Sequence, residues 1–145
     1  MIRLVPFKKE HIDCMDVREH EKYLIDKELL AIFETGLAFT GVKEGKIISC
    51  GGLLVKAFGN ADVWQIPSIY VSDVKLSYCK VIRNWLNEQA KELSLSRMET
   101  ISLDDGLHDR WMRFVGFEKE GVKRRYINGK DYAMWGRLFE VENGN

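Results

Sequence analysis

The pattern of apolar and polar positions along the chain predicts alternating strands and helices. Stretches in which every second residue is apolar indicate strands, and apolar residues three and four positions apart indicate helices. The predicted strands cover residues 2–5, 37–42, 47–55, 62–71, 98–103, 118–126 and 132–138. The predicted helices cover residues 8–20, 21–34, 73–93 and 105–115, and a polar tail at 142–145 is expected to fray. This order indicates an α/β fold in which helices are interspersed with the strands of a mixed sheet.

The length and composition of the chain fit one globular domain. The chain has 145 residues, of which 46% are hydrophobic and 30% charged, and a domain of this size can bury a core without metals or disulfides. No internal repeat, linker or low-complexity segment is visible. We therefore expect residues 1–145 to form a single domain.

Charge and targeting features restrict the class of partner. The chain has 22 basic and 22 acidic residues. A nucleic-acid-binding protein normally has a clustered basic excess, so we expect no nucleic-acid partner. No apolar run approaches the roughly 18 residues of a membrane helix, and the N-terminus has no apolar signal region, so neither a membrane span nor a secretion signal is expected. The low net charge gives little protection against self-association.

The cysteines do not indicate a metal site. Cys14, Cys50 and Cys79 are widely spaced, with no neighbouring Cys or His at zinc-ligand spacing. Three reduced thiols in a cytosolic setting are the simplest interpretation. Cys79 lies near the start of the longest predicted helix, where the helix dipole could lower a thiol pKa, but a buried structural cysteine is favoured.

The segment HDRWMRFVGFEKEGV, residues 108–122, combines a short amphipathic helix, a Gly-Phe step and a strand. It resembles the last-helix region of the GNAT (Gcn5-related N-acetyltransferase) family, and the predicted order of elements is similar to that family over nearly the whole chain. The resemblance implies a mixed, mostly antiparallel central sheet of about six to seven strands, with about four helices on its faces.

A narrower resemblance covers residues 63–117. Arg83-Asn84-Trp85-Leu86 and the run from Arg110 to Phe117 are similar to patterns found in small GNAT-like proteins of tailed bacteriophages. One branch of that group is counted among virion or morphogenesis proteins. The resemblance implies a location in the host cytoplasm, packaging in the phage particle, and phage structural proteins or further copies of the chain as partners.

If the chain is an enzyme, the GNAT resemblance implies acetyl-CoA as its cofactor. The pyrophosphate would meet backbone N–H groups at the start of the long helix, where relatives have a glycine-containing loop. The corresponding residues 71–80 contain no glycine, and Asp73, Val74 and Tyr78 add bulk or negative charge there. The candidate cofactor-binding residues are Tyr70, Val71, Ser72, Lys75, Ser77 and Lys80.

The candidates for catalysis are few. An N-acetyltransferase often uses a general base to remove a proton from the amine. Glu34 and Asp62 are the candidates for this role, although an exposed surface charge is the simpler interpretation of each. Many relatives have a tyrosine, four residues before the Gly-Phe step, that protonates the departing thiolate. The residue at that position is Met112, which cannot donate a proton.

Two further polar features have simple structural explanations. His108 follows Asp105 at the start of a short helix, where capping is favoured over catalysis. The run Lys123-Arg124-Arg125 could contact a phosphate or an acidic partner, but a solvated strand edge that deters strand pairing is favoured.

Two functions from different classes therefore stand. The first is an acetyl-CoA-dependent N-acetyltransferase that acts on an amine of a small molecule or protein. The second is a phage virion or assembly component that keeps the fold without the chemistry. The glycine-free segment and Met112 favour the second.

Overall fold

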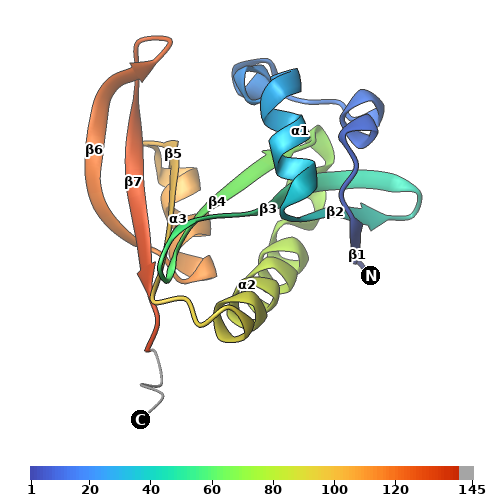
Figure 1. Ribbon diagram of the computed structural model, residues 1–145. Helices are drawn as coiled ribbons and strands as arrows, with labels where there is room; N and C mark the ends of the chain where they lie inside the picture. Colours follow the sequence, from blue (N-terminus) through green and yellow to red (C-terminus); the bar gives the residue numbers. More distant parts are fainter. Residues whose placement is uncertain (141–145) are drawn as a thin grey trace. The chain divides into compact units, whose positions relative to one another are not determined.

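The computed structural model describes residues 1–140, apart from the side chains of His20, Tyr23 and Leu24, so the predicted polar tail lies outside the described residues. The strands are β1 (Arg3–Pro6), β2 (Leu37–Lys43), β3 (Lys46–Ala57), β4 (Asn60–Pro67), β5 (Arg97–Leu103), β6 (Glu118–Ile127) and β7 (Lys130–Leu138). The α-helices are α1 (Lys27–Thr35), α2 (Lys75–Glu92) and α3 (Gly106–Val115). The 3-10 helices are η1 (Lys9–Cys14), η2 (Glu19–Leu24) and η3 (Ile69–Val74) (Figure 1).

The described chain divides into two compact units, to which β3 and β4 both contribute. The first unit holds Met1–Leu54 and Val63–Tyr78, and the second holds Val55–Asp62 and the chain from Cys79 onward. In the first unit the strand order is β1-β2-β3-β4, with β2 antiparallel to both of its neighbours. In the second unit β4 pairs in parallel with β5, and β7 lies antiparallel between β5 and β6. The seven-stranded, mixed and mostly antiparallel sheet confirms the predicted fold class.

An aromatic stack lies in the core of the first unit. Phe33 of α1 stacks on Trp64 of β4 with ring centroids 3.9 Å apart, and Phe7 meets the same indole edge-on at 5.3 Å. Gly52 on β3 leaves space for this packing. A Cβ at position 52 would lie 2.9 Å from Trp64 Nε1 and 2.3 Å from the carbonyl oxygen of Leu37. Large aromatic side chains contribute much of the buried area of a small core. Glycine at position 52 therefore allows the packing of Trp64, which a larger residue would displace.

The Gly-Phe step forms the C-terminal cap of α3 in the second unit. Gly116 has φ 107°, a conformation that favours glycine, and its N–H donates to the Arg113 carbonyl at 3.1 Å. The Phe117 N–H donates to the Met112 carbonyl at 2.9 Å. These two bonds make a Schellman motif, in which the residue after the glycine packs into the core. Phe117 is correspondingly buried.

The predicted helices over residues 8–34 were partly wrong. The structure has the short η1 and η2 there, and α1 begins only at Lys27. Asp26 defines this start, because its Oδ1 accepts the N–H groups of Glu28 at 2.9 Å and Leu29 at 3.1 Å. A side-chain N-cap of this kind starts a new helix and separates it from the preceding turn.

The predicted strand over residues 62–71 was also partly wrong. β4 ends at Pro67, and residues 69–71 belong to η3. Proline has no backbone N–H to donate, and Ser68 then caps the 3-10 helix. Val71 was predicted to lie in the strand because it is apolar. It is only 1% exposed, and an apolar side chain indicates burial, which a 3-10 helix can provide as well as a strand. The other predicted strands and helices agree with the structure to within two residues at each end.

A pair of isoleucines tests the core. Ile66 on β4 is completely buried, whereas Ile32 on α1 is 53% exposed. Ile66→Ala is expected to lower the free energy of unfolding by about 2–5 kcal/mol, because it removes buried methyl groups and leaves a cavity. Ile32→Ala, the same chemical change at the surface, is expected to stay within about 0.5 kcal/mol. Urea unfolding followed by tryptophan fluorescence measures both values, and equal effects would contradict the assigned core.

Candidate functional site

The β4–α2 turn, residues 68–74, is the segment where the resemblance placed a phosphate. Here η3 runs directly into α2. The first backbone N–H groups of the turn have partners within the protein. Ile69 donates to the Asp16 carbonyl at 2.9 Å, Tyr70 donates to Ser68 Oγ at 3.2 Å, and Val71 donates to the Ser68 carbonyl at 3.2 Å. A helix start binds an anion through backbone N–H groups that have no partner in the protein. The first three N–H groups of this turn do have partners, so they are not available to an anion.

The predicted cofactor-binding side chains have different environments. Val71 is buried in the core, so its side chain is not available to a ligand. Ser72 and Ser77 are exposed, Tyr70 and Lys75 are half-buried, and Lys80 is exposed on the part of α2 that belongs to the second unit. Tyr78, which adds bulk to this segment, is 3% exposed.

Two cations near the turn were missed by the sequence analysis. The Arg18 guanidinium donates to Ser72 Oγ and also approaches Glu21 Oε1 at 3.9 Å. Lys46 Nζ lies 4.7 Å from the centre of the Tyr70 ring. These residues come from the segment before η2 and from the β2–β3 hairpin, and no local sequence pattern indicates that they meet the turn. The positive charge that a phosphate would require is therefore present beside the turn, although its glycines are not.

Glu34, one of the two predicted bases, stabilises a helix start. Its Oε2 accepts the Lys9 N–H at 2.7 Å, at the first residue of η1. A carboxylate at this position satisfies a backbone N–H that has no partner within its own helix. The side chain is exposed and is held by this backbone contact.

Asp62, the other predicted base, belongs to a surface ion-pair network of the second unit. Lys56 Nζ lies 3.0 Å from Asp62 Oδ1 and 3.1 Å from Glu99 Oε1. Hydrogen bonds to these two carboxylates raise the pKa of Lys56. A hydrogen bond from Asn60 and another from Lys56 lower the pKa of Glu99. The two predicted bases lie in different units, and each has a structural partner.

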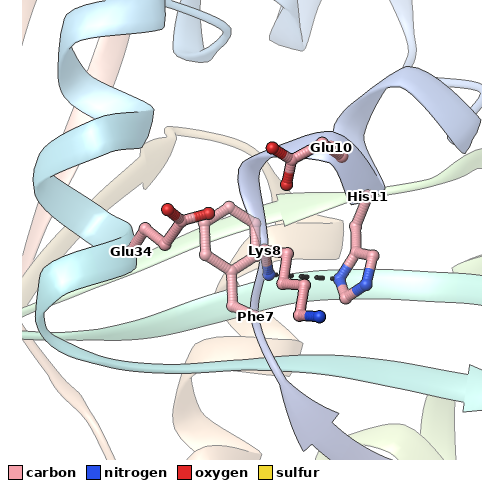
Figure 2. A pocket seen from close by; sticks show the side chains of 5 residues that line it. All are labelled: Phe7, Lys8, Glu10, His11 and Glu34. Carbon is pink, nitrogen blue, oxygen red and sulfur yellow. Dashed lines mark hydrogen bonds between the residues drawn. The ribbon is translucent and has the colours of Figure 1, made fainter.

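Glu34 lines an open pocket with Phe7, Lys8, Glu10 and His11, and the pocket has a volume of about 740 Å³ (Figure 2). The Lys8 N–H donates to His11 Nδ1 at 3.2 Å, and Thr40 Oγ1 lies 2.7 Å from the same nitrogen. Because Nδ1 accepts the backbone N–H, the neutral imidazole carries its proton on Nε2. The pocket thus holds a carboxylate and an imidazole in fixed positions, and these groups can exchange a proton with a bound polar molecule.

The thiol behind this pocket is unreactive. Cys50 Sγ lies 3.4 Å from Thr40 Oγ1 and is fully buried. Burial raises the pKa of Cys50 to about 11, although the hydrogen bond with Thr40 acts in the opposite direction. A thiol with so high a pKa supplies almost no thiolate near neutral pH, so it is not a nucleophile. Cys79 is buried, as expected, and Cys14 is exposed.

The last-helix residues have structural roles. The His108 N–H donates to Asp105 Oδ1 at 2.8 Å, and His108 Nδ1 lies 2.7 Å from the same oxygen. This contact matches the predicted capping role. Burial tends to raise the pKa of Asp105, but the two hydrogen bonds with His108 outweigh it and the pKa is lowered.

Residues 1–140 hold neither a cluster of metal-binding side chains nor a membrane-spanning helix. No group of three or more His, Cys, Asp or Glu side chains in that range is arranged to hold a metal ion. In the same part of the chain, no helix is long and apolar enough to cross a membrane.

The structure has the fold of GNAT acetyltransferases. It superimposes on Ard1 from Thermoplasma volcanium with a TM-score of 0.77 and 9% identity, over 96% of this chain and 98% of that one. A GNAT-family acetyltransferase from Bacillus anthracis gives a TM-score of 0.71 with 12% identity, over 94% of each chain. The ribosomal-protein-S18-alanine N-acetyltransferase from Escherichia coli gives 0.70 with 14% identity, over 100% of this chain and 98% of that one. No family model and no curated protein matches the sequence. At these identities the likeness establishes the fold alone.

The ion-pair network around Asp62 should make the free energy of unfolding depend on pH. The pKa of Glu99 is lowered in the folded protein, so its contribution to stability is present above its unfolded pKa of about 4.3 and is lost as the pH falls. Glu99→Gln is expected to lower the free energy of unfolding by about 0.5–1 kcal/mol at pH 7, since the pair is partly solvated, and to have no effect near pH 2.

Urea unfolding at both pH values measures this difference. Glu88→Gln, at an exposed position of α2 before its last turn, is the matched control and should change neither value. A Glu99→Gln effect of the same size at both pH values would show that the charge does not contribute.

Proposed function

We propose that this chain uses the acetyltransferase fold as a non-catalytic scaffold and acts as a virion or assembly component of a tailed bacteriophage. One observation carries the non-catalytic part of the proposal. The β4–α2 turn, which would have to receive the pyrophosphate of acetyl-CoA, is a continuous helical stretch whose first three N–H groups are bonded to Asp16 and Ser68.

The side chains of this stretch also fit the cofactor poorly. Residues 60–105 contain no glycine, so every residue of the turn carries a Cβ where backbone and phosphate would have to approach closely. Asp73 is exposed and adds negative charge at the same place. The residues present therefore do not fit acetyl-CoA bound in the manner that the fold implies.

The side chains that acyl transfer would require as acid and base are also poorly suited to those roles. Met112 cannot protonate a departing thiolate. Asp62 is paired with Lys56, and Glu34 caps η1. Fold alone does not imply function, because unrelated activities and non-enzymes share the same architectures. The phage part of the proposal is supported by the resemblance of residues 63–117 to small phage proteins, with phage structural proteins or further copies of the chain as partners.

A second function is favoured by one specific observation. Arg18 and Lys46 place positive charge beside Ser72 and Tyr70 of the turn. If these cations hold the pyrophosphate of acetyl-CoA, an acetyl-CoA-dependent N-acetyltransferase acting on an amine becomes the favoured function. The two functions differ in whether the protein binds the cofactor.

Calorimetric titration with acetyl-CoA separates the two functions. We expect no binding at millimolar cofactor, because the turn has no glycine and uses its first N–H groups internally. Micromolar binding would overturn the non-catalytic proposal. If such binding is lost in Arg18→Gln and kept in Lys27→Gln, which removes one charge from the exposed start of α1, the turn is the cofactor site.

The assembly role has its own test. Particles purified from a host that expresses the gene together with the phage should contain the chain at a fixed ratio to the major structural proteins, as measured by quantitative mass spectrometry. Its absence from mature particles and from assembly intermediates would contradict the role. That result would leave the cofactor-binding experiment unaffected.

A further inference from the structure

The tip of the β6–β7 hairpin, residues 123–131, departs from regular strand geometry. Lys123 lies opposite Tyr132, and Ile127 lies opposite Lys130. The three β6 residues between these pairs therefore face a single β7 residue, Asp131. Residues 124–126 are all exposed, whereas consecutive residues of a regular strand point alternately to opposite faces.

A strained backbone position holds this bulge. Arg125 has φ 51°, which is unfavourable for a residue with a Cβ. Its N–H donates to Asp131 Oδ1 at 2.9 Å, and this bond fixes the position. Bulges and strained residues often re-aim side chains at functional positions. Here the bulge gathers the side chains of Arg124, Arg125 and Tyr126 at the end of the hairpin.

The bulge concentrates positive charge in a chain of zero net charge. Lys123, Arg124, Arg125 and Lys130 stand against one carboxylate, Asp131. None of these four cations takes part in an ion pair within the described residues. By contrast, Lys56, Arg97 and Lys119 of the same unit are all paired with carboxylates.

Carboxylates on the neighbouring turn do not neutralise the tip. The β5–α3 turn joins the hairpin through the Asp104 N–H, which donates to the Asp131 carbonyl at 3.1 Å. Asp104 is already paired with Lys119 at 2.6 Å, and Asp105 is bonded to His108. The basic tip also lies beyond the last residue that β5 pairs with β7, Leu103, so it projects from the sheet of the second unit (Figure 1).

An aromatic ring stands among these charges. Tyr126 is 48% exposed. Tyr132 packs against it edge-on with ring centroids 5.9 Å apart, and Lys123 Nζ lies 4.5 Å from its centre. The ring is therefore held in place while half of its surface remains open to solvent.

We propose that this hairpin tip binds single-stranded nucleic acid. Guanidinium and ammonium groups would contact the phosphates, and the exposed part of the Tyr126 ring would stack with a base, which is the combination that binds single strands without sequence preference. A protein partner is less well matched, because lysine is depleted at protein interfaces and this tip, which carries Lys123 and Lys130 beside its two arginines, has few apolar groups. The balanced charge of the whole chain predicted no nucleic-acid partner, and the proposal stands on the placement of the charges.

Fluorescence anisotropy with a labelled thymidine oligonucleotide of about 20 nucleotides tests the proposal at low salt. Binding through three or four phosphates should give a slope of log K against log salt of about −2 to −3. Arg124→Gln/Arg125→Gln should weaken binding by about tenfold and reduce the slope by about 1.4, which corresponds to two lost contacts. Lys9→Gln/Lys27→Gln removes the same charge from exposed positions of the first unit and should bind as the unmodified protein does.

A second variant separates binding from folding. Arg125→Gly removes one cation at a position where φ 51° suits glycine, so it should keep the hairpin intact while weakening binding. No binding at low salt would overturn the proposal, as would equal losses in the two double variants. Displacement of the oligonucleotide by poly-glutamate at equal charge concentration, with a higher affinity for the polypeptide, would overturn it in favour of an acidic protein partner.

Discussion

The hydrogen bonds of Ser68 organise the first unit around its candidate site. The Ser68 N–H and its hydroxyl both donate to the Ile48 carbonyl at 2.9 Å, which ties the end of β4 to β3. Its Oγ accepts the Tyr70 N–H, and its carbonyl accepts the Val71 N–H, so the same residue starts η3. Ser68 is 1% exposed, and a buried hydroxyl that lacked these partners would carry a desolvation cost of about 1–3 kcal/mol. The end of β4, the start of η3 and the adjacent strand β3 are thus held together by one residue.

This arrangement has a consequence for chemistry. A helix start binds an anion through N–H groups that have no partner in the protein. Here Ser68 and Asp16 take the first of these groups, and Arg18 fastens the next part of the turn through Ser72. The interactions that fix the turn therefore also occupy N–H groups that a phosphate would otherwise contact. The chain shares the fold of acetyltransferases at sequence identities of 9–14%, and a fold can be shared without a shared function.

Charged residues have two different arrangements within the second unit. Lys56, Arg97 and Lys119, on the strands of the second unit, are paired with carboxylates, as in the Lys56, Asp62 and Glu99 network. The hairpin tip lacks such pairing, and its bulge places two arginines and a tyrosine on a projecting end. Paired charges stabilise the sheet surface modestly, whereas unpaired and gathered charges create a local field that can attract an oppositely charged partner. The net charge of the whole chain sums paired and unpaired charges alike, so it does not indicate where unpaired cations gather.

The sequence by itself determined the features that depend on neighbouring residues. Helix α2 followed from the spacing of its apolar residues, and the α3 cap followed from Gly116 and Phe117, because capping bonds span only a few residues. The absence of glycine at the β4–α2 turn and the methionine at position 112 were equally readable. These features were enough to identify the fold and to question its chemistry.

Only the tertiary structure decided which distant residues meet. Glu34 caps η1 through Lys9, Arg18 reaches Ser72, and Asp131 holds the strained Arg125. Each contact depends on the path of the chain between its two residues, so no local pattern encodes it. The structure also decided the conformation at Val71. Its apolar side chain predicted a strand, but the residue is buried in a 3-10 helix. Hydrophobic burial is non-directional, and backbone hydrogen bonding therefore selected the local structure there.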